Sequence, residues 1–142
     1  MTKKRLNLIF ALGLLLVTAL ACNFSASTAN ISSLKIGKDA NISTETETFA
    51  AGDTVYAAAV ISNASEKLKV KGRLVADSVE GLQSGPVAGA EKTLEMEGGG
   101  TAKFSFTPGE NGWPKGKYKM EVLMMNEAGE QKDQKTVSFT VS

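Results

Sequence analysis

The sequence predicts an all-β fold, a sandwich of about seven antiparallel strands preceded by an N-terminal signal helix. The first observation is a two-residue alternation of apolar and polar side chains in most segments beyond residue 30. The second is that these segments are short and are separated by Gly, Pro, Asn and Asp residues, which favour turns. The third is that no segment after Cys22 has the 3.6-residue period of an amphipathic helix.

The first 22 residues are typical of an export signal. Three basic residues, Lys3–Arg5, precede an apolar run, Leu6–Leu20, and small residues lead into Cys22. The run is short for a transmembrane helix, which needs about 20 apolar residues, and no charged residues flank its far end. We therefore expect this segment to be removed after export.

The end of this segment, Thr-Ala-Leu-Ala-Cys at positions 18–22, resembles the lipobox of bacterial lipoproteins. The resemblance implies that Cys22 receives a diacylglyceryl group, that residues 1–21 are cut off, and that the new amino group is acylated, for example with palmitate. The chain has Ala19 where most lipoboxes have Leu. Asn23, in place of the Asp that retains such proteins in the inner membrane, implies the outer membrane, on its periplasmic or surface face.

The predicted organisation has three parts: a signal peptide at 1–21, the lipidated Cys with a flexible polar tether at 22–30, and one sandwich domain at 31–142. Cys22 is the only cysteine, so no intrachain disulfide can form. The domain must therefore be held together by an apolar core.

The first half of the domain contains three predicted strands. Ile31–Lys38 is a short strand, Asp39–Thr48 is a polar segment suited to an exposed edge, and Thr54–Ser62 is apolar enough to be central. Lys67–Ala76 alternates most clearly. Its inward face is predicted to contain Leu68, Val70, Gly72, Leu74 and Ala76, and its outward face Lys67, Lys69, Lys71 and Arg73. The inward glycine predicts a bulge or a close approach.

The second half begins with a predicted loop at Ser78–Glu91, which is rich in Gly and Pro. Thr93–Glu97, with Leu94 and Met96 inward, and the strand that follows are joined by three glycines and predict a hairpin. The last three predicted strands share the same alternation, and their inward residues are Ala102, Phe104 and Phe106, then Tyr118, Met120, Val122 and Met124, then Val137, Phe139 and Val141.

Trp-Pro-Lys-Gly-Lys-Tyr at positions 113–118 stands at the start of one of these strands. It resembles the tyrosine corner of Greek-key sandwiches, in which the tyrosine hydroxyl bonds back to nearby backbone. Together with the alternating strands that follow, residues 108–142 resemble bacterial immunoglobulin-like domains. The resemblance implies the fold without a function. It departs from antibody domains in lacking both core cysteines.

Composition excludes several functions. The chain has no His, which excludes Ser-His-Asp and Cys-His catalysis and the usual zinc sites, and we predict no catalytic residues, no cofactor and no enzymatic activity. It has 16 basic and 15 acidic residues, and acids alternate with bases through most of it. Nucleic acid is therefore not expected as a partner.

Two groups of residues keep a carrier function open as an alternative. The thioethers of Met96, Met120, Met124 and Met125 would suit Cu(I), although methionine more often fills gaps in a core. The carboxylates of Asp39, Asp53, Asp77 and Glu80 lie near predicted strand ends, where Ca²⁺ can bind, but they lack the spacing of a known calcium loop.

The candidate contact residues are the basic stripe, Lys67, Lys69, Lys71 and Arg73, and the only tryptophan, Trp113. A basic stripe can meet an acidic partner or anionic lipid, and it can equally be a solvated strand face. An exposed Trp can anchor a partner, and a loop Trp can also cap a core. We predict a membrane-anchored, non-enzymatic module that contacts another envelope protein or a surface polymer.

Overall fold

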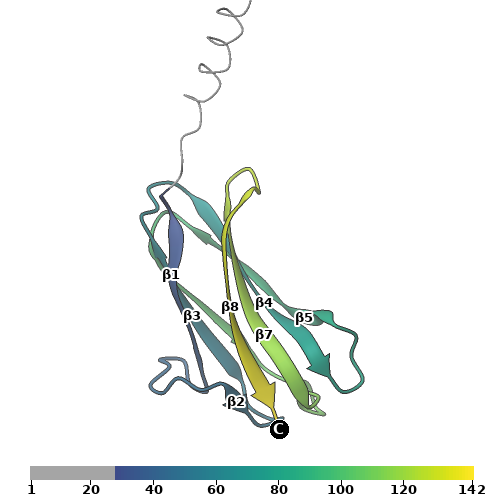
Figure 1. Ribbon diagram of the computed structural model, residues 1–142. Coiled ribbons are helices and arrows are strands. Elements are labelled where there is room, and N and C mark those ends of the chain that lie inside the picture. Colours follow the sequence, from purple (N-terminus) through teal and green to yellow (C-terminus); the bar gives the residue numbers. More distant parts are fainter. Residues whose placement is uncertain (1–27) are drawn as a thin grey trace, which may run out of the picture.

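The structure, a computed structural model, describes residues 28–142, and these residues form strands and turns without a helix (Figure 1). None of the described residues belongs to a helix that could cross a membrane. The predicted signal helix and Cys22 lie outside the described residues. The strands are β1 (Asn30–Gly37), β2 (Thr48–Phe49), β3 (Val55–Ser62), β4 (Leu68–Val79), β5 (Gly85–Met96), β6 (Gly100–Phe106), β7 (Gly116–Asn126) and β8 (Gln131–Val141).

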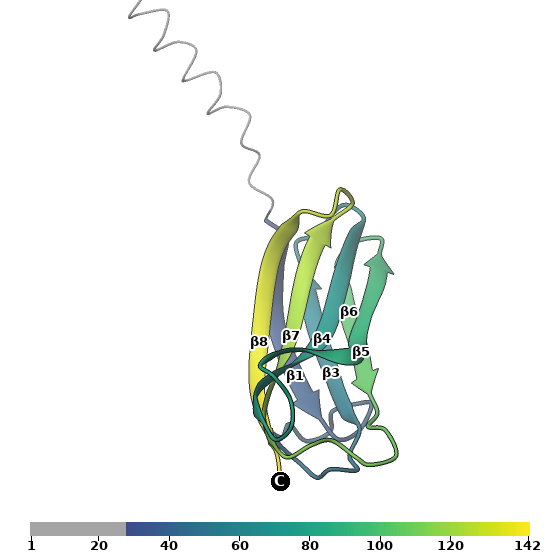
Figure 2. The same ribbon diagram turned by 90° about the vertical axis from the view of Figure 1, so that its right-hand side faces the viewer.

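Two sheets pack face to face, which confirms the predicted all-β sandwich (Figures 1 and 2). One sheet has the order β1-β3-β6, and the other has the order β2-β8-β7-β4-β5. All neighbours are antiparallel except β2, which runs parallel to β8. Consecutive strands β3 and β4 lie in different sheets, as in immunoglobulin-like folds.

The tyrosine corner is present. Tyr118 is buried near the start of β7, and its hydroxyl donates a hydrogen bond to the carbonyl of Pro114 at 2.6 Å. Its ring stacks on Phe139 of β8 at a centroid distance of 5.3 Å, and Phe49 of β2 meets Phe139 edge-on at 5.2 Å. These rings join three strands of the larger sheet at one end of the core.

The inward faces predicted from alternation form the core between the sheets. In β4 the predicted inward set is buried, and the neighbouring residues Lys69, Lys71 and Arg73 are half-exposed on the outer face. A Cβ at Gly72 would lie 2.7 Å from the ring of Phe104 in β6. The glycine therefore marks a close approach of the two sheets, one of the two predicted possibilities, and it places β6 opposite β4.

Two predictions about connectivity are wrong. Much of the predicted loop 78–91 is strand, because β4 continues to Val79 and β5 begins at Gly85. Pro86 is tolerated there because β5 is an edge strand, with one side free of pairing. The three glycines at 98–100 do not close a hairpin: β5 belongs to the larger sheet and β6 to the smaller, so this connection crosses between the sheets.

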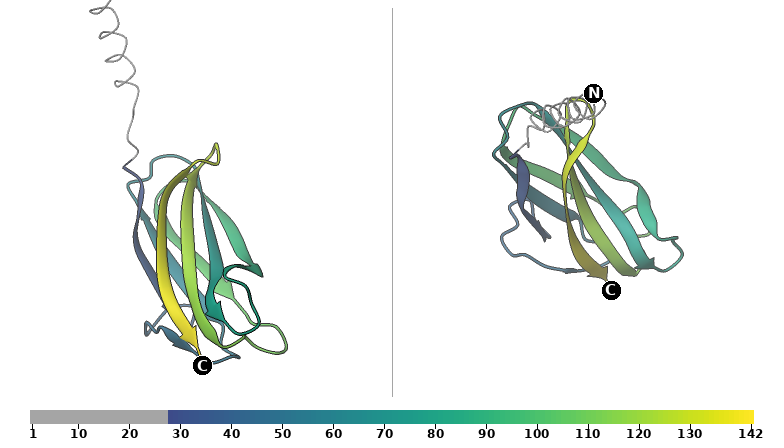
Figure 3. Two further views of the ribbon diagram at one scale, coloured as in Figure 1. Left: turned by 45° about the vertical axis from the view of Figure 1, so that its right-hand side comes forward. Right: turned by 45° about the horizontal axis from the view of Figure 1, so that its top comes forward.

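The strand directions give the domain two distinct ends (Figure 3). The chain enters β1 at the end that also contains the β3–β4, β5–β6 and β7–β8 connections, which we call the tether end. The opposite, distal end contains β2, the β4–β5 and β6–β7 connections and the C-terminal residue.

Candidate functional site

The predicted basic stripe lies along the outer face of the larger sheet, and most of it is ion-paired. The ammonium of Lys67 is 3.6 Å from Glu97, and that of Lys71 is 3.4 Å from Glu91. Lys69 has no ion pair among the described residues. Acidic side chains from the neighbouring strands β5 and β7, and from Glu97 just after β5, thus lie beside most of the basic residues of the stripe. The role of the stripe as a partner contact stays a prediction.

The closest of these pairs joins Arg73 of β4 to Glu121 of β7. The guanidinium Nη2 is 2.9 Å from Oε1 of the carboxylate, and Glu121 is the only buried charged residue in the described part of the chain, at 8% exposed. The two residues face each other directly in the strand register. The pair locks two central strands together and is poorly placed to contact a partner.

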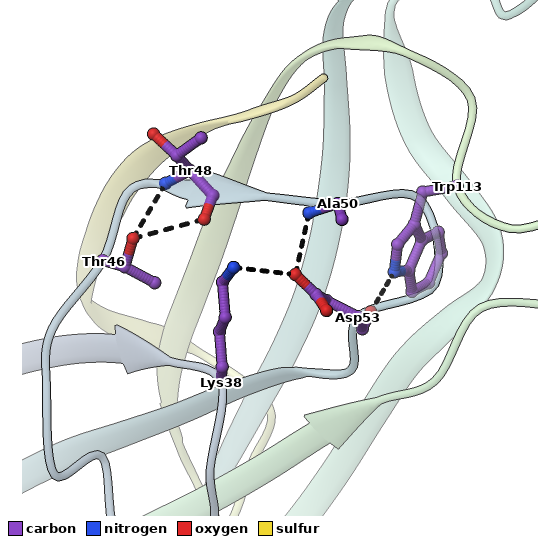
Figure 4. Close-up of polar contacts among 6 residues, drawn as sticks. All are labelled: Lys38, Thr46, Thr48, Ala50, Asp53 and Trp113. Carbon is purple, nitrogen blue, oxygen red and sulfur yellow. Dashed lines mark hydrogen bonds and ion pairs between the residues drawn. The ribbon is translucent and has the colours of Figure 1, made fainter.

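Trp113 fastens the β6–β7 connection to the distal end (Figure 4). Its indole N–H donates to the carbonyl of Asp53 at 2.8 Å, and its backbone N–H donates to the carbonyl of Ala51 at 2.7 Å. The side chain is half-buried against the core. Both N–H groups are therefore used within the fold, and only part of the ring surface remains for the predicted contact.

Asp53 holds the turn on which Trp113 rests (Figure 4). Its carboxylate accepts the backbone N–H of Ala50 at 2.8 Å and lies 3.0 Å from the ammonium of Lys38. The bond from Ala50, followed by the Lys38 charge, lowers the pKa of this carboxyl below its ordinary value. Next to it, the hydroxyl of Thr46 accepts the backbone N–H of Thr48, so the segment is closed by local bonds.

The groups considered for metal binding are used elsewhere or stand apart. Asp39 accepts the backbone N–H groups of Asn41 and Ser43, and the bond from Ser43 is the main cause of its lowered pKa. Within residues 28–142, no three Asp, Glu, His or Cys side chains are grouped closely enough to hold a metal ion. Met120 and Met124 are buried core residues, whereas Met96 and Met125 are half-buried.

Two open hollows lie on the described surface. One, of about 390 Å³, is at the tether end between the β3–β4 connection, Lys132 and the last residues of β7. The other, of about 340 Å³, lies between the edges of β5 and β6 and is lined by Lys92, Phe106 and Trp113 among others.

Lys92 is the residue in this second hollow that we did not single out from the sequence. Its ammonium lies 2.5 Å from the carbonyl oxygen of Ser105 and 5.4 Å from the ring centroid of Phe106. The signal in the sequence is its position: Lys92 lies two residues before Leu94 and four before Met96, so its side chain is on the same inward face of the strand. An inward-facing charge at a sheet edge is a sign of a specific role.

No protein-family model and no curated protein sequence matches this chain. Among solved structures, the DNA glycosylase AlkC of Pseudomonas fluorescens has a TM-score of 0.51 and 14% identity, covering 81% of this chain and 30% of AlkC. A Niemann-Pick type C2 protein from the Japanese carpenter ant gives 0.49 and 12%, covering 84% and 96%. The PmoD soluble domain from Methylocystis gives 0.43 and 17%, covering 77% and 89%. At these identities the AlkC match supports the fold alone.

Proposed function

We propose that this chain is a lipid-anchored protein of the bacterial cell envelope whose domain is a non-enzymatic binding module. Its partner is another envelope protein or a surface polymer. The observation that supports this most directly is that the lipobox-like Cys22 stands just before Asn30, where β1 begins. The segment between them reaches at most about 29 Å when fully extended.

The position of the attachment point supports a binding role. The tether end would be nearest the membrane, and the distal end and both outer faces would remain accessible to a partner. Two or three acyl chains are enough to hold such a domain durably, at about 0.8 kcal/mol per buried CH₂ group. The chemistry of the described side chains also fits binding better than catalysis, since Asp39 and Asp53 hold turns and Arg73 is paired with Glu121.

The substitution Cys22→Ala tests the anchor. The expected result is that the protein no longer incorporates radiolabelled or clickable palmitate and leaves the membrane fraction, or accumulates as uncut precursor. Cys22→Ser is a matched control for the size of the side chain and should behave in the same way. Acyl labelling and membrane association that survive both changes would show that the anchor is elsewhere.

A further inference from the structure

We propose that the free edge of β6 is an interaction surface that takes up an extended segment of a partner protein as an additional strand. This inference names the surface for the binding role proposed above and rests on that role, but it does not depend on the lipid anchor. Addition of a strand to an exposed sheet edge is a general mode of peptide recognition.

The two sheets differ in width on this side of the sandwich. Phe104 of β6 lies on Gly72 of β4, so β6, the last strand of the smaller sheet, is opposite β4. The larger sheet continues for one more strand, β5, beyond β4. Both free edges are on the same side of the domain (Figure 2). In the described chain no strand lies opposite β5, and the place beside β6 is open.

The backbone of β6 presents its hydrogen-bonding groups to this open place. The carbonyl of Val60 in β3 accepts the hydroxyl of Ser32 in β1, so even-numbered residues of β3 point toward β1 and odd-numbered residues toward β6. The partners of those odd-numbered residues are Phe104 and Ala102. The alternation of an antiparallel ladder then directs the N–H and C=O groups of Thr101, Lys103 and Ser105 toward the open edge.

The bond from Lys92 agrees with this assignment. Its ammonium reaches the carbonyl of Ser105 from β5, on the open side. Lys92 thus occupies one acceptor of the free edge and leaves the groups of Lys103 and Thr101 without a partner among the described residues. An incoming strand would take over the Ser105 carbonyl and release the ammonium for a carboxylate.

The inner face of β5 would provide the side-chain contacts. Leu94 and Met96 point inward but are only half-buried, because no strand lies beneath them. The hollow of about 340 Å³ continues this surface toward Phe106 and Trp113. An extended segment with alternating apolar residues would cover Leu94 and Met96.

Charge specifies the partner further. Two cations, Lys92 and Lys103, flank the open place, and Lys103 has no ion pair in the described part of the chain. The fitting occupant is therefore a strand whose inward residues are apolar over Leu94 and Met96 and acidic near Lys92. Its outward residues are polar or acidic beside Lys103.

The opposite side of the sandwich is closed in several places, which makes the β6 edge distinctive. Asp133 of β8 accepts the backbone N–H of Ile31 at the start of β1, at 2.8 Å. The backbone N–H of Thr46 bonds to the carbonyl of Ile36 near the end of β1, at 3.1 Å. β2 covers the end of β8.

The test uses the mature lipoprotein in detergent and a phage-displayed library of random peptides about nine residues long, enough to span one strand. Enriched peptides should have apolar residues at alternate positions, one acidic residue of that same parity, and polar or acidic residues between them. They should slow hydrogen exchange of the amides of Lys103 and Ser105. Lys103→Pro deletes the outward N–H together with the ammonium, and it should bind peptide about tenfold more weakly than Lys103→Ala, as expected for one lost hydrogen bond. Lys103→Ala removes the same ammonium but keeps that N–H, so it is the matched control for the backbone effect.

Several outcomes would overturn the inference. These are no enriched peptide, enriched peptides that bind Lys103→Pro as tightly as the wild type, protection of amides in another strand, or a wild-type dimer whose interface protects the β6 edge. If Lys103→Pro does not fold, the variant Thr101→Pro is used in its place, because it removes the next outward N–H of β6. A failed Cys22 test with successful peptide binding would refute the envelope anchor alone, and the reverse result would refute the edge alone.

Discussion

At the scale of single residues, the contact between Gly72 and Phe104 determines how closely the sheets approach. The Phe104 ring fills space that a side chain on β4 would otherwise occupy, so the two residues form one packing unit across the core. Alternation in the sequence identifies Gly72 as inward but leaves a bulge and a close approach as alternatives. Only the position of a residue in the other sheet decides between them.

Gly72→Ala should therefore destabilise the domain by about 1–3 kcal/mol, because the new Cβ would overlap the Phe104 ring and force repacking. Gly52→Ala is the matched control, since a Cβ there meets nothing within 4 Å. Urea unfolding followed by circular dichroism measures both. A Gly72→Ala midpoint equal to that of Gly52→Ala would contradict the close approach.

At the scale of secondary-structure elements, alternation predicts β4, β6, β7 and β8 and their inward faces, because each has a buried inner side, whereas β3 is predicted from its short apolar run. The outer side of β7 is partly buried as well, at Glu121 and Leu123. Alternation cannot predict which strands share a sheet. The glycines at 98–100 suit a hairpin and a crossing between sheets equally well. The first half of β5 is not predictable from the sequence, because Pro86 and its glycines are turn formers that an edge strand also accepts.

The site was less predictable than the fold for a related reason. The sequence showed the charges of the basic stripe but not the acids of β5 and β7 that pair with them, since those pairs depend on strand order. The sequence does not point to Lys92, because the Gly- and Pro-rich stretch before it predicts a strand that begins only at Thr93. A charge acquires its role from its neighbours across the sheet, which alternation in one strand does not reveal.

The pair of Arg73 and Glu121 allows a test of strand-to-strand coupling. Arg73→Met and Glu121→Met alone should each cost about 1–3 kcal/mol, because each leaves a largely buried charge without its partner. The double variant should regain most of that loss, since methionines on neighbouring strands can pack together. Chemical unfolding of the four proteins gives the coupling energy.

The exposed pair of Lys67 and Glu97, at 3.6 Å, is the matched control for this cycle. Its coupling should be below about 0.5 kcal/mol, as for most exposed ion pairs. Equal coupling in the two cycles would show that burial of Glu121 does not strengthen the interaction. A double variant as unstable as the worse single one would show that the charges do more than satisfy each other.

At the scale of the whole molecule, the domain has ends of different construction. The sandwich is held by the shared core of the two sheets, which includes the rings of Phe49, Tyr118 and Phe139 at the distal end. By contrast, the turn at 50–53 and the β6–β7 connection at that end are fastened by a few polar bonds around Asp53 and Trp113. Trp113 is the only tryptophan, so its fluorescence reports on that end alone. This difference predicts that the turn and the connection around Trp113 can open while the sheets remain paired.

Acid should reveal that opening. The pKa of Asp53 is lowered in the folded state, first by the Ala50 N–H and then by Lys38, so its contribution to stability is present at neutral pH. That contribution is lost as the pH falls through the lowered pKa, below about pH 4, the ordinary Asp range. We expect Trp113 fluorescence to change in this range while the circular dichroism of the sheets is retained.

Asp53→Asn should abolish the acid step, because the amide does not titrate. Asp39→Asn is the matched control: the pKa of Asp39 is also lowered, by Ser43, but that carboxylate has no bond to the turn beneath Trp113. The step should therefore persist in Asp39→Asn. Persistence in Asp53→Asn as well, or simultaneous loss of the sheet signal, would mean that the distal end is not an independent unit. The sandwich would then unfold as one body from end to end.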